Sequence, residues 1–213
     1  GIVVGEIMPI PLLYLMVSWM GAKGLAEGIY LYPEQFESLL DALNAHYDRQ
    51  VQPAADSPAE VIWFPDNITG SIISPRLYAR YCAPVYARAM PIMRAARKIP
   101  IDHYDGSNRP LLQVVAGTDL PVIEAFTPPP MGDLPVAEAK AAWPDKVIWV
   151  NFPGCHFTQP AEFIQSYTLD LLQNAAPGGR LVLGCTEEFP VDEFVKTFTA
   201  IGRALAEYEG YAW

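Results

Sequence analysis

The stretch 99-IPIDHYDG-106 decides how this sequence is interpreted, because it is a short apolar run that stops abruptly on polar residues. Such a run predicts a buried β-strand, and in chains that alternate strands with helices the chemistry collects where strands end. His103 and Asp105 stand two residues apart at this end, so their side chains point to the same side of the strand. A second apolar run, residues 180–185 (RLVLGC), ends on Cys185 at a comparable place. We therefore expect the function to depend on whether these two strand ends meet.

The composition predicts one well-cored domain over residues 1–213. Of the 213 residues, 51% are hydrophobic and 18% charged, which suffices for a core and differs from a disordered segment. The net charge is −10, and the 14 lysines and arginines are scattered, so we expect no nucleic-acid partner, because phosphate binding needs clustered cations. Three widely spaced cysteines, Cys82, Cys155 and Cys185, form no disulfide framework and are typical of a reducing cytoplasm.

The most apolar part of the chain is residues 2–20, whose length resembles that of a membrane span or a signal peptide. Glu6, Pro9 and Pro11 interrupt it, and no basic segment or cleavage-like site accompanies it. We therefore expect no membrane association and interpret this part as a buried strand followed by a buried helix. Because the chain starts at Gly1 and a strand signal begins at once, we expect either an artificial first residue or a fragment whose natural beginning is missing.

Strands and helices alternate along the whole chain. Strands are predicted over residues 2–8, 60–64, 99–106, 120–125, 146–151 and 180–185. Helices are predicted to follow them, with Pro53 ending the helix that starts at Pro33, and Ser74 capping the next. Six strands each followed by a helix indicate a parallel sheet covered by helices. Both an open doubly wound sheet and a (β/α) barrel fit this order.

Two features favour the barrel. No glycine-rich phosphate-binding fingerprint follows the first strand, and nearly every strand ends on a polar residue, as a barrel mouth requires. These residues are Glu6, Asp66, His103 with Asp105, Glu124, Asn151 and Cys185. A closed barrel takes eight strands, so six predict a partial TIM (β/α)8-type barrel with two unpaired edges. Either further strands lie outside this chain, or residues 2–8 and 180–185 pair with another copy, and we predict this homodimer.

Several motifs together resemble the uroporphyrinogen decarboxylase-like superfamily. They run from Asp66 through 71-SIISPRLYARYCAPVYARAM-90 to 103-HYDG-106, and continue with 127-TPPPMGDLPVAEA-139, 150-VNFP-153 and 184-GCTEEFPVDEF-194. The resemblance covers essentially the whole chain. It implies a (β/α)8 barrel of which this sequence matches the third to eighth units.

The superfamily contains two chemistries, and the first is the decarboxylation of uroporphyrinogen. Those decarboxylases carry an N-terminal arginine-rich motif and an early-strand aspartate, and this chain contains neither. They also carry a tyrosine in a PYTL turn and a histidine in a closing GHG turn, where this chain has Ile10 and Cys185. The resemblance therefore gives little support to porphyrinogen decarboxylation.

The second chemistry is that of the corrinoid-linked methyltransferases, which this chain resembles where it departs from the decarboxylases. They bind zinc through an H-x-C motif and a closing-turn cysteine; His103 and Cys185 match, while Asp105 replaces the first cysteine. Zinc accepts His, Asp and Cys ligands, can keep one position open for substrate, and deprotonates a bound thiol. The resemblance implies a zinc-dependent methyltransferase with a small thiol as acceptor and a corrinoid protein as partner.

These considerations assign a role to each strand-end residue. His103 and Asp105 are the expected catalytic residues, and together with Cys185 they are the expected zinc ligands. Contacts to the small-molecule substrate are expected from the other strand ends, Asp66, Glu6, Glu124 and Asn151. Of these, Glu6 or Glu124 is placed to complete a metal site.

Two alternatives stay open. In one, the protein is a metal-free decarboxylase in which His103 and Asp105 act as acid and base or orient the substrate. In the other, the barrel is catalytically incomplete because two of its edges are unpaired. The remaining polar candidates are interpreted as structural or surface residues: His46, Asn67, Cys155 and His156. Asp133 fits equally a site residue and a support for the proline-rich loop.

Overall fold

The computed structural model describes residues 1–208. Six parallel strands form one open sheet in the order β1-β2-β3-β4-β5-β6. The strands are β1 (Val4–Glu6), β2 (Val61–Ile68), β3 (Ile99–Tyr104), β4 (Val122–Phe126), β5 (Val147–Asn151) and β6 (Leu181–Gly184). A doubly wound sheet reverses its strand order near the middle, whereas a barrel wall does not. The prediction of parallel strands in a partial (β/α) barrel is therefore confirmed.

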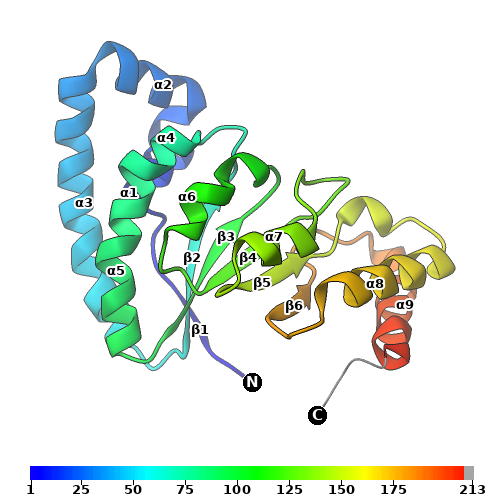
Figure 1. Ribbon diagram of the computed structural model, residues 1–213. Helices are drawn as coiled ribbons and strands as arrows, with labels where there is room; N and C mark the ends of the chain where they lie inside the picture. The colour runs from blue at the N-terminus through cyan, green and yellow to red at the C-terminus, as the bar shows by residue number, and fades with distance from the viewer. Residues whose placement is uncertain (209–213) are drawn as a thin grey trace.

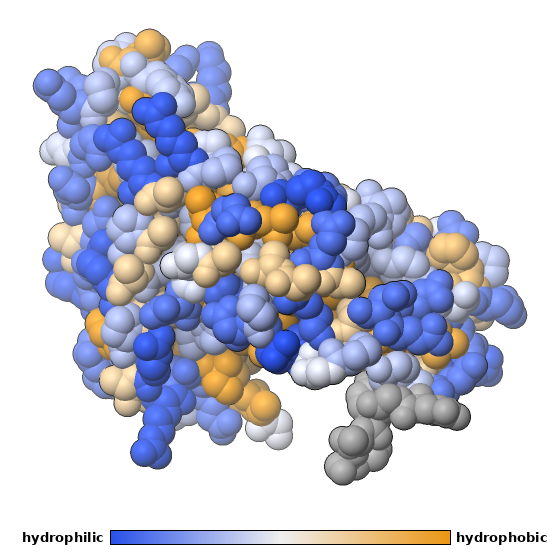
Figure 2. Space-filling view, viewed as in Figure 1, coloured by the Kyte–Doolittle hydropathy of each residue, from blue (hydrophilic) through white to orange (hydrophobic). Residues whose placement is uncertain are grey.

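Helical segments connect each strand to the next (Figure 1). The longer helices are α2 (Gly21–Leu31), α3 (Pro33–Asp56), α5 (Ala83–Ala95), α8 (Ala161–Ala175) and α9 (Phe194–Glu207). The shorter ones are α1 (Pro11–Tyr14), α4 (Pro75–Leu77), α6 (Leu112–Ala116) and α7 (Val136–Ala142). Hydrophilic side chains cover much of their outer surface (Figure 2). Within residues 1–208, no helix is both long and apolar enough to cross a membrane.

Side chains alternate between the two faces of the sheet. Those that point to the helices are almost completely buried in the main core, as in Ile62, Phe64, Ile123 and Ile148. The intervening residues point the other way, where a small apolar cluster contains strand residues alone: Val61, Trp63, Ile101, Val122, Val147 and Trp149. We call this second side the inner face, because it corresponds to the side that lines a closed barrel. Helices thus bury one face and leave the inner face to the candidate site.

β2 is longer than the sequence predicts. It continues through Pro65 to Ile68, with a register shift against β3 between Phe64 and Ile68 and with Asn67 at a φ of 51°. The irregularity accommodates Pro65, which has no N–H to donate to the sheet. Asp66 consequently lies within a strand, and the prediction that this strand stops at Phe64 is wrong.

α3 also continues beyond its predicted end, because Pro53 does not stop it before Asp56. A proline in the last turn removes a single helix hydrogen bond. Burial of Val51 and Ala55 against the core stabilises this turn, as does a 2.8 Å hydrogen bond from Gln52 Nε2 to Asp56 Oδ1. The predicted cap of the next helix is present, since Ser74 Oγ accepts a 3.2 Å hydrogen bond from the Leu77 N–H.

Ile123→Ala tests whether the helix-facing side of β4 contributes to the stability of the folded protein. Ile123 is 0% exposed, so we expect the free energy of unfolding to fall by about 2 to 5 kcal/mol through lost burial and a residual cavity. Ile72→Ala removes the same atoms from a residue that is 45% exposed and serves as the matched control in urea unfolding. Equal losses in the two variants would contradict this assignment of the core.

Candidate active site

His103 and Glu124 meet on the inner face from neighbouring strands, where they are paired in register. His103 Nδ1 lies 2.8 Å from Glu124 Oε2, and Trp63 Nε1 donates a 3.1 Å hydrogen bond to the same oxygen. The Glu124 side chain is 7% exposed and that of His103 is 20% exposed. A carboxylate that fixes one imidazole nitrogen orients the ring and leaves the other nitrogen for proton transfer. Glu124 is therefore placed to orient His103.

A second polar group lies at the carboxyl ends of β3 to β6. Thr127 Oγ1 donates a 2.7 Å hydrogen bond to Asp105 Oδ1. Asn151, which is 1% exposed, donates from Nδ2 to Glu187 Oε1 at 2.9 Å and accepts the Thr186 N–H at Oδ1 at 2.9 Å. The segment that follows β6 is thereby anchored to β5. This network holds two carboxylates, Asp105 and Glu187, at the same rim of the sheet.

Glu6 and Trp149 belong to the inner face on either side of His103. Glu6 is exposed and pairs in register with Trp63 on the neighbouring strand. Trp149 lies against Gly184, where an added Cβ would come within 2.4 Å of the Trp149 Nε1, so the indole packs closely because this residue is a glycine. Five of the predicted residues therefore belong to the inner face or its rim: Glu6, His103, Asp105, Glu124 and Asn151.

A bulge in β4 changes which face of the sheet its side chains occupy. The register against β5 shifts between Ile123 and Phe126, and Ala125 has a φ of 54°. Positive φ is uncommon for residues other than glycine and often occurs at functional sites. Because of this extra residue, Glu124 faces inward while Phe126, two positions later, is buried in the main core. Because of the bulge, Glu124 belongs to the candidate site and Phe126 belongs to the core, although the two residues are only two positions apart on the same strand.

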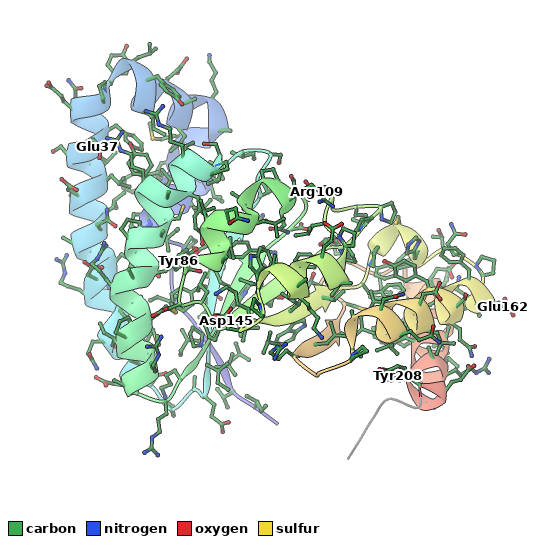
Figure 3. All side chains as sticks on the ribbon, viewed as in Figure 1. Glu37, Tyr86, Arg109, Asp145, Glu162 and Tyr208 are labelled. Atoms are coloured by element: carbon green, nitrogen blue, oxygen red, sulfur yellow. The ribbon has the colours of Figure 1, made fainter. Side chains whose placement is uncertain are left out.

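The structure corrects the expectation that Asp66 contacts the substrate. Asp66 is 0% exposed and lies on the helix-facing side of β2. Its Oδ1 accepts a 2.6 Å hydrogen bond from the Ile10 N–H, and its Oδ2 accepts a 2.7 Å hydrogen bond from the Tyr86 hydroxyl. Tyr86 extends from α5 toward the sheet (Figure 3). Asp66 therefore makes hydrogen bonds within the protein interior and is not placed to contact a ligand at the rim.

Cys185 also points away from the inner face. It follows Leu183 by two residues, and both pack against the apolar cluster between β6, α8 and α9. Burial raises the pKa of the Cys185 thiol to about 11, which disfavours the reactive thiolate form near neutral pH. Within residues 1–208, no three His, Cys, Asp or Glu side chains form a group that could hold a metal ion. The predicted zinc ligands, His103, Asp105 and Cys185, therefore do not fit a zinc site.

Asp133 supports the proline-rich loop. It accepts hydrogen bonds from Ser107 Oγ at 2.7 Å and from the backbone N–H groups of Asn108 and Arg109 at 2.8 and 3.0 Å. Partial burial raises the pKa of this carboxyl, but these hydrogen bonds prevail and lower the pKa below its ordinary value. Asp133 thus fastens the loop after β4 to the loop after β3.

The other polar candidates lie apart from His103. Cys155 is exposed, and its Sγ lies 3.8 Å from Nδ1 of His156. The His156 ring packs against Phe163 and Tyr167, with ring centroids 5.0 and 4.5 Å away, and burial lowers the pKa of this histidine. His46 and Asn67 are exposed. None of these contacts involves the residues of the inner face.

Sequence reasoning missed three residues that shape the site: Trp63, Thr127 and Glu187. Trp63 was hidden within an apolar run, although its alternation with Ile62 and Phe64 places it on the opposite face. Thr127 and Glu187 follow strand ends in the segments 127-TPPP-130 and 186-TEEFP-190. Their partners lie on other strands, so only the assembled sheet shows that they bind Asp105 and Asn151.

Comparisons with known proteins agree with this architecture. The profile of the family described as uroporphyrinogen decarboxylase (URO-D) matches residues 2–207. No curated protein sequence matches significantly. Among solved structures, a methyltransferase from Methanosarcina mazei superposes with a TM-score of 0.65 at 16% sequence identity, covering 95% of this chain and 58% of that one. The protein is an α/β chain of the partial-barrel class, and it belongs to the URO-D family.

The structural likeness to the methyltransferase shows a shared fold. This chain spans less than two thirds of that protein's length. Its strands correspond to a part of the larger protein, which is consistent with an open sheet of six strands.

Thiol labelling tests the position of Cys185. We expect iodoacetamide to modify Cys155 first, Cys185 much more slowly and Cys82 last, because these thiols are exposed, partly buried and buried, and only a thiolate reacts. Peptide mass spectrometry over time, with Cys155→Ser to isolate the slower sites, gives the order. Rapid modification of Cys185 near neutral pH would show an activated thiolate and contradict this placement.

Proposed function

We propose that this protein is a methyltransferase of the URO-D family in which His103 removes the proton from a small thiol acceptor. The pair formed by His103 and Glu124, 2.8 Å apart on the inner face, carries the proposal. Nδ1 is engaged by Glu124, so Nε2 is the nitrogen that takes the proton. Loss of the S–H proton to Nε2 leaves a thiolate, whose sulfur forms the new bond to the methyl carbon as the donor's bond to that carbon breaks.

The charges of the site favour a neutral or cationic acceptor. Glu124, Asp105 and Glu187 make hydrogen bonds to Trp63, His103, Thr127 and Asn151. None of the hydrogen bonds or ion pairs that these three carboxylates make within residues 1–208 involves lysine or arginine. A substrate with several carboxylates would therefore meet like charges from these three side chains. This arrangement disfavours porphyrinogen decarboxylation in comparison with methyl transfer.

A corrinoid protein is the methyl donor that we propose. The donor supplies an electrophilic methyl group, and the resemblance of the sequence to corrinoid-linked methyltransferases supports this class of donor. The likeness of the fold to the Methanosarcina mazei methyltransferase is consistent with it. Zinc has no part in this proposal, because the side chains of the inner face do not form a three-ligand set.

Methyl transfer from methylcobalamin to small thiols tests the proposed function. We expect cysteamine and 2-mercaptoethanol to be methylated faster than thioglycolate, because the acidic site repels an anion. His103→Ala should lower kcat/KM by about 100- to 10,000-fold, the usual contribution of a general base. His46→Ala changes a histidine on the exposed side of α3 and should leave the rate unchanged.

Three results would count against the proposal. If thiols are methylated no faster than without protein, the proposed activity is wrong. If His103→Ala leaves the rate unchanged, the proposed role of His103 as the base is wrong. A preference for the anionic thiol would contradict the charge argument. Release of carbon dioxide from a carboxylated porphyrinogen, lost in His103→Ala, would instead support the decarboxylase alternative.

The free edges of the sheet lead us to propose a homodimer. Ile2, Val3 and Val4 at one edge are 68%, 63% and 52% exposed, and Val182 at the other is 38% exposed. Exposed apolar edge strands present unpaired backbone groups that favour pairing with another chain. Light scattering should therefore give about twice the mass of one chain, and Val4→Lys should lower it. A monodisperse monomer at all concentrations would contradict this association.

A further inference from the structure

Two carboxyl groups lie together beneath the helices, outside the candidate active site. Asp66 and Asp102 are both 0% exposed. Asp102 on β3 is paired in register with Phe64 on β2, and Asp66 follows Phe64 by two residues, so both acids point to the helix-facing side. The two acids therefore occupy the same buried region between β2, β3 and α5.

The two acids differ in the hydrogen bonds that they receive. Asp66 accepts one hydrogen bond at each oxygen, from the Ile10 N–H and from the Tyr86 hydroxyl. Asp102 interacts with the Asp66 carboxyl, the Tyr86 hydroxyl and the His103 N–H, but within residues 1–208 no hydrogen bond of normal geometry reaches either of its oxygens. Donors stabilise a carboxylate, whereas a buried carboxylate without donors is costly. Asp66 is thus suited to the ionised form and Asp102 to the neutral form.

Within residues 1–208, no lysine or arginine is among the groups that act on this pair. The titratable groups that face this pair come from α3, from the helical segment that precedes α5, from α5 itself and from β3. In that order they are Tyr47, then Tyr78 and Cys82, then Tyr86, and finally His103 and Tyr104. Tyr47 is also fully buried, and its hydroxyl has no hydrogen-bond partner within the described chain. His103 points to the inner face, where Glu124 neutralises it when it is protonated.

We propose that Asp66 and Asp102 share a single proton at neutral pH, with Asp102 as the protonated member and Asp66 as the carboxylate. The proton lies on Asp102 and is directed toward Asp66, so one negative charge remains in the pair. Burial raises the pKa of Asp102 well above its ordinary value, and the charge of Asp66 adds to this. Burial also raises the pKa of Asp66, to about 6.

The two acids connect several parts of the fold. Asp66 holds the Ile10 N–H at the start of α1 and the Tyr86 hydroxyl on α5, while Asp102 directly precedes His103 on β3. Removal of the proton would place two negative charges side by side in the interior and repel β2 from β3. The pair therefore makes the support of the active site sensitive to alkaline pH.

The sign of the pH dependence follows from the raised pKa of Asp102. Below the ordinary pKa of an aspartic acid, the folded and unfolded chains both carry the proton, and its contribution to stability is complete. As the pH rises toward the pKa of the folded state, only the folded chain keeps the proton, so stability falls. Each retained proton raises the unfolding equilibrium constant by about tenfold per pH unit.

Asp102→Asn tests the proposal in urea unfolding from about pH 5 to about pH 8. The amide is neutral at every pH and retains a donor for Asp66, so we expect the pH slope to lose one proton's contribution, about tenfold per unit. The variant should exceed the wild type in stability at the alkaline end. Asp41→Asn, which changes an exposed aspartate on α3, should leave the slope unchanged.

Infrared spectroscopy of the wild-type protein decides the question even if Asp102→Asn fails to fold. A protonated buried carboxyl should give a carboxylic C=O band at neutral pH that is lost at alkaline pH. Absence of this band at neutral pH would overturn the proposal, and so would equal pH slopes in the wild type and a folded Asp102→Asn.

Discussion

Helices cover one face of this parallel sheet, and strand alternation assigns every strand residue to the covered face or the open one. Burial of Ile62, Phe64, Ile123 and Ile148 against the helices fixes the register of the strands. Once that register is fixed, Glu6, His103 and Glu124 must point to the inner face, in register with their neighbours. The core therefore determines the composition of the site, even though the two share no side chains.

This constraint explains why one acid serves the site and another the interior. Glu124 holds His103 through Oε2, with Trp63 Nε1 as a second donor, at a place where solvent reaches the ring. Asp66 and Asp102 belong to the opposite face of the same strands and are sealed beneath α5. In the first case the His103 ring and the Trp63 indole engage the carboxylate, and in the second we propose a shared proton. Both arrangements follow from the cost of leaving a carboxylate unpaired away from water.

Sequence reasoning predicted the order of strands and helices and the collection of polar residues at strand ends. Those features depend on local patterns such as 99-IPIDHYDG-106, whose apolar run and abrupt end are visible in the sequence itself. It failed for Asp66 and Cys185, because a strand-end position does not state which face a side chain occupies. Counting in twos from the buried Phe64 and from Leu183 would have placed both on the helix-facing side. The bulge at Ala125 changes that count after Glu124 and had no clear signal in the sequence.

The proposed chemistry requires that Glu124 fixes His103 through Nδ1 and leaves Nε2 free to accept a proton. Nitrogen NMR of protein labelled at its 3 histidines tests this claim most directly, because the resonances report which ring nitrogen carries a hydrogen. We expect a His103 Nδ1–H that is protected from exchange in the wild type and loses that protection in Glu124→Ala. A His103 ring protonated at Nε2 alone, with a spectrum unchanged in Glu124→Ala, would contradict it.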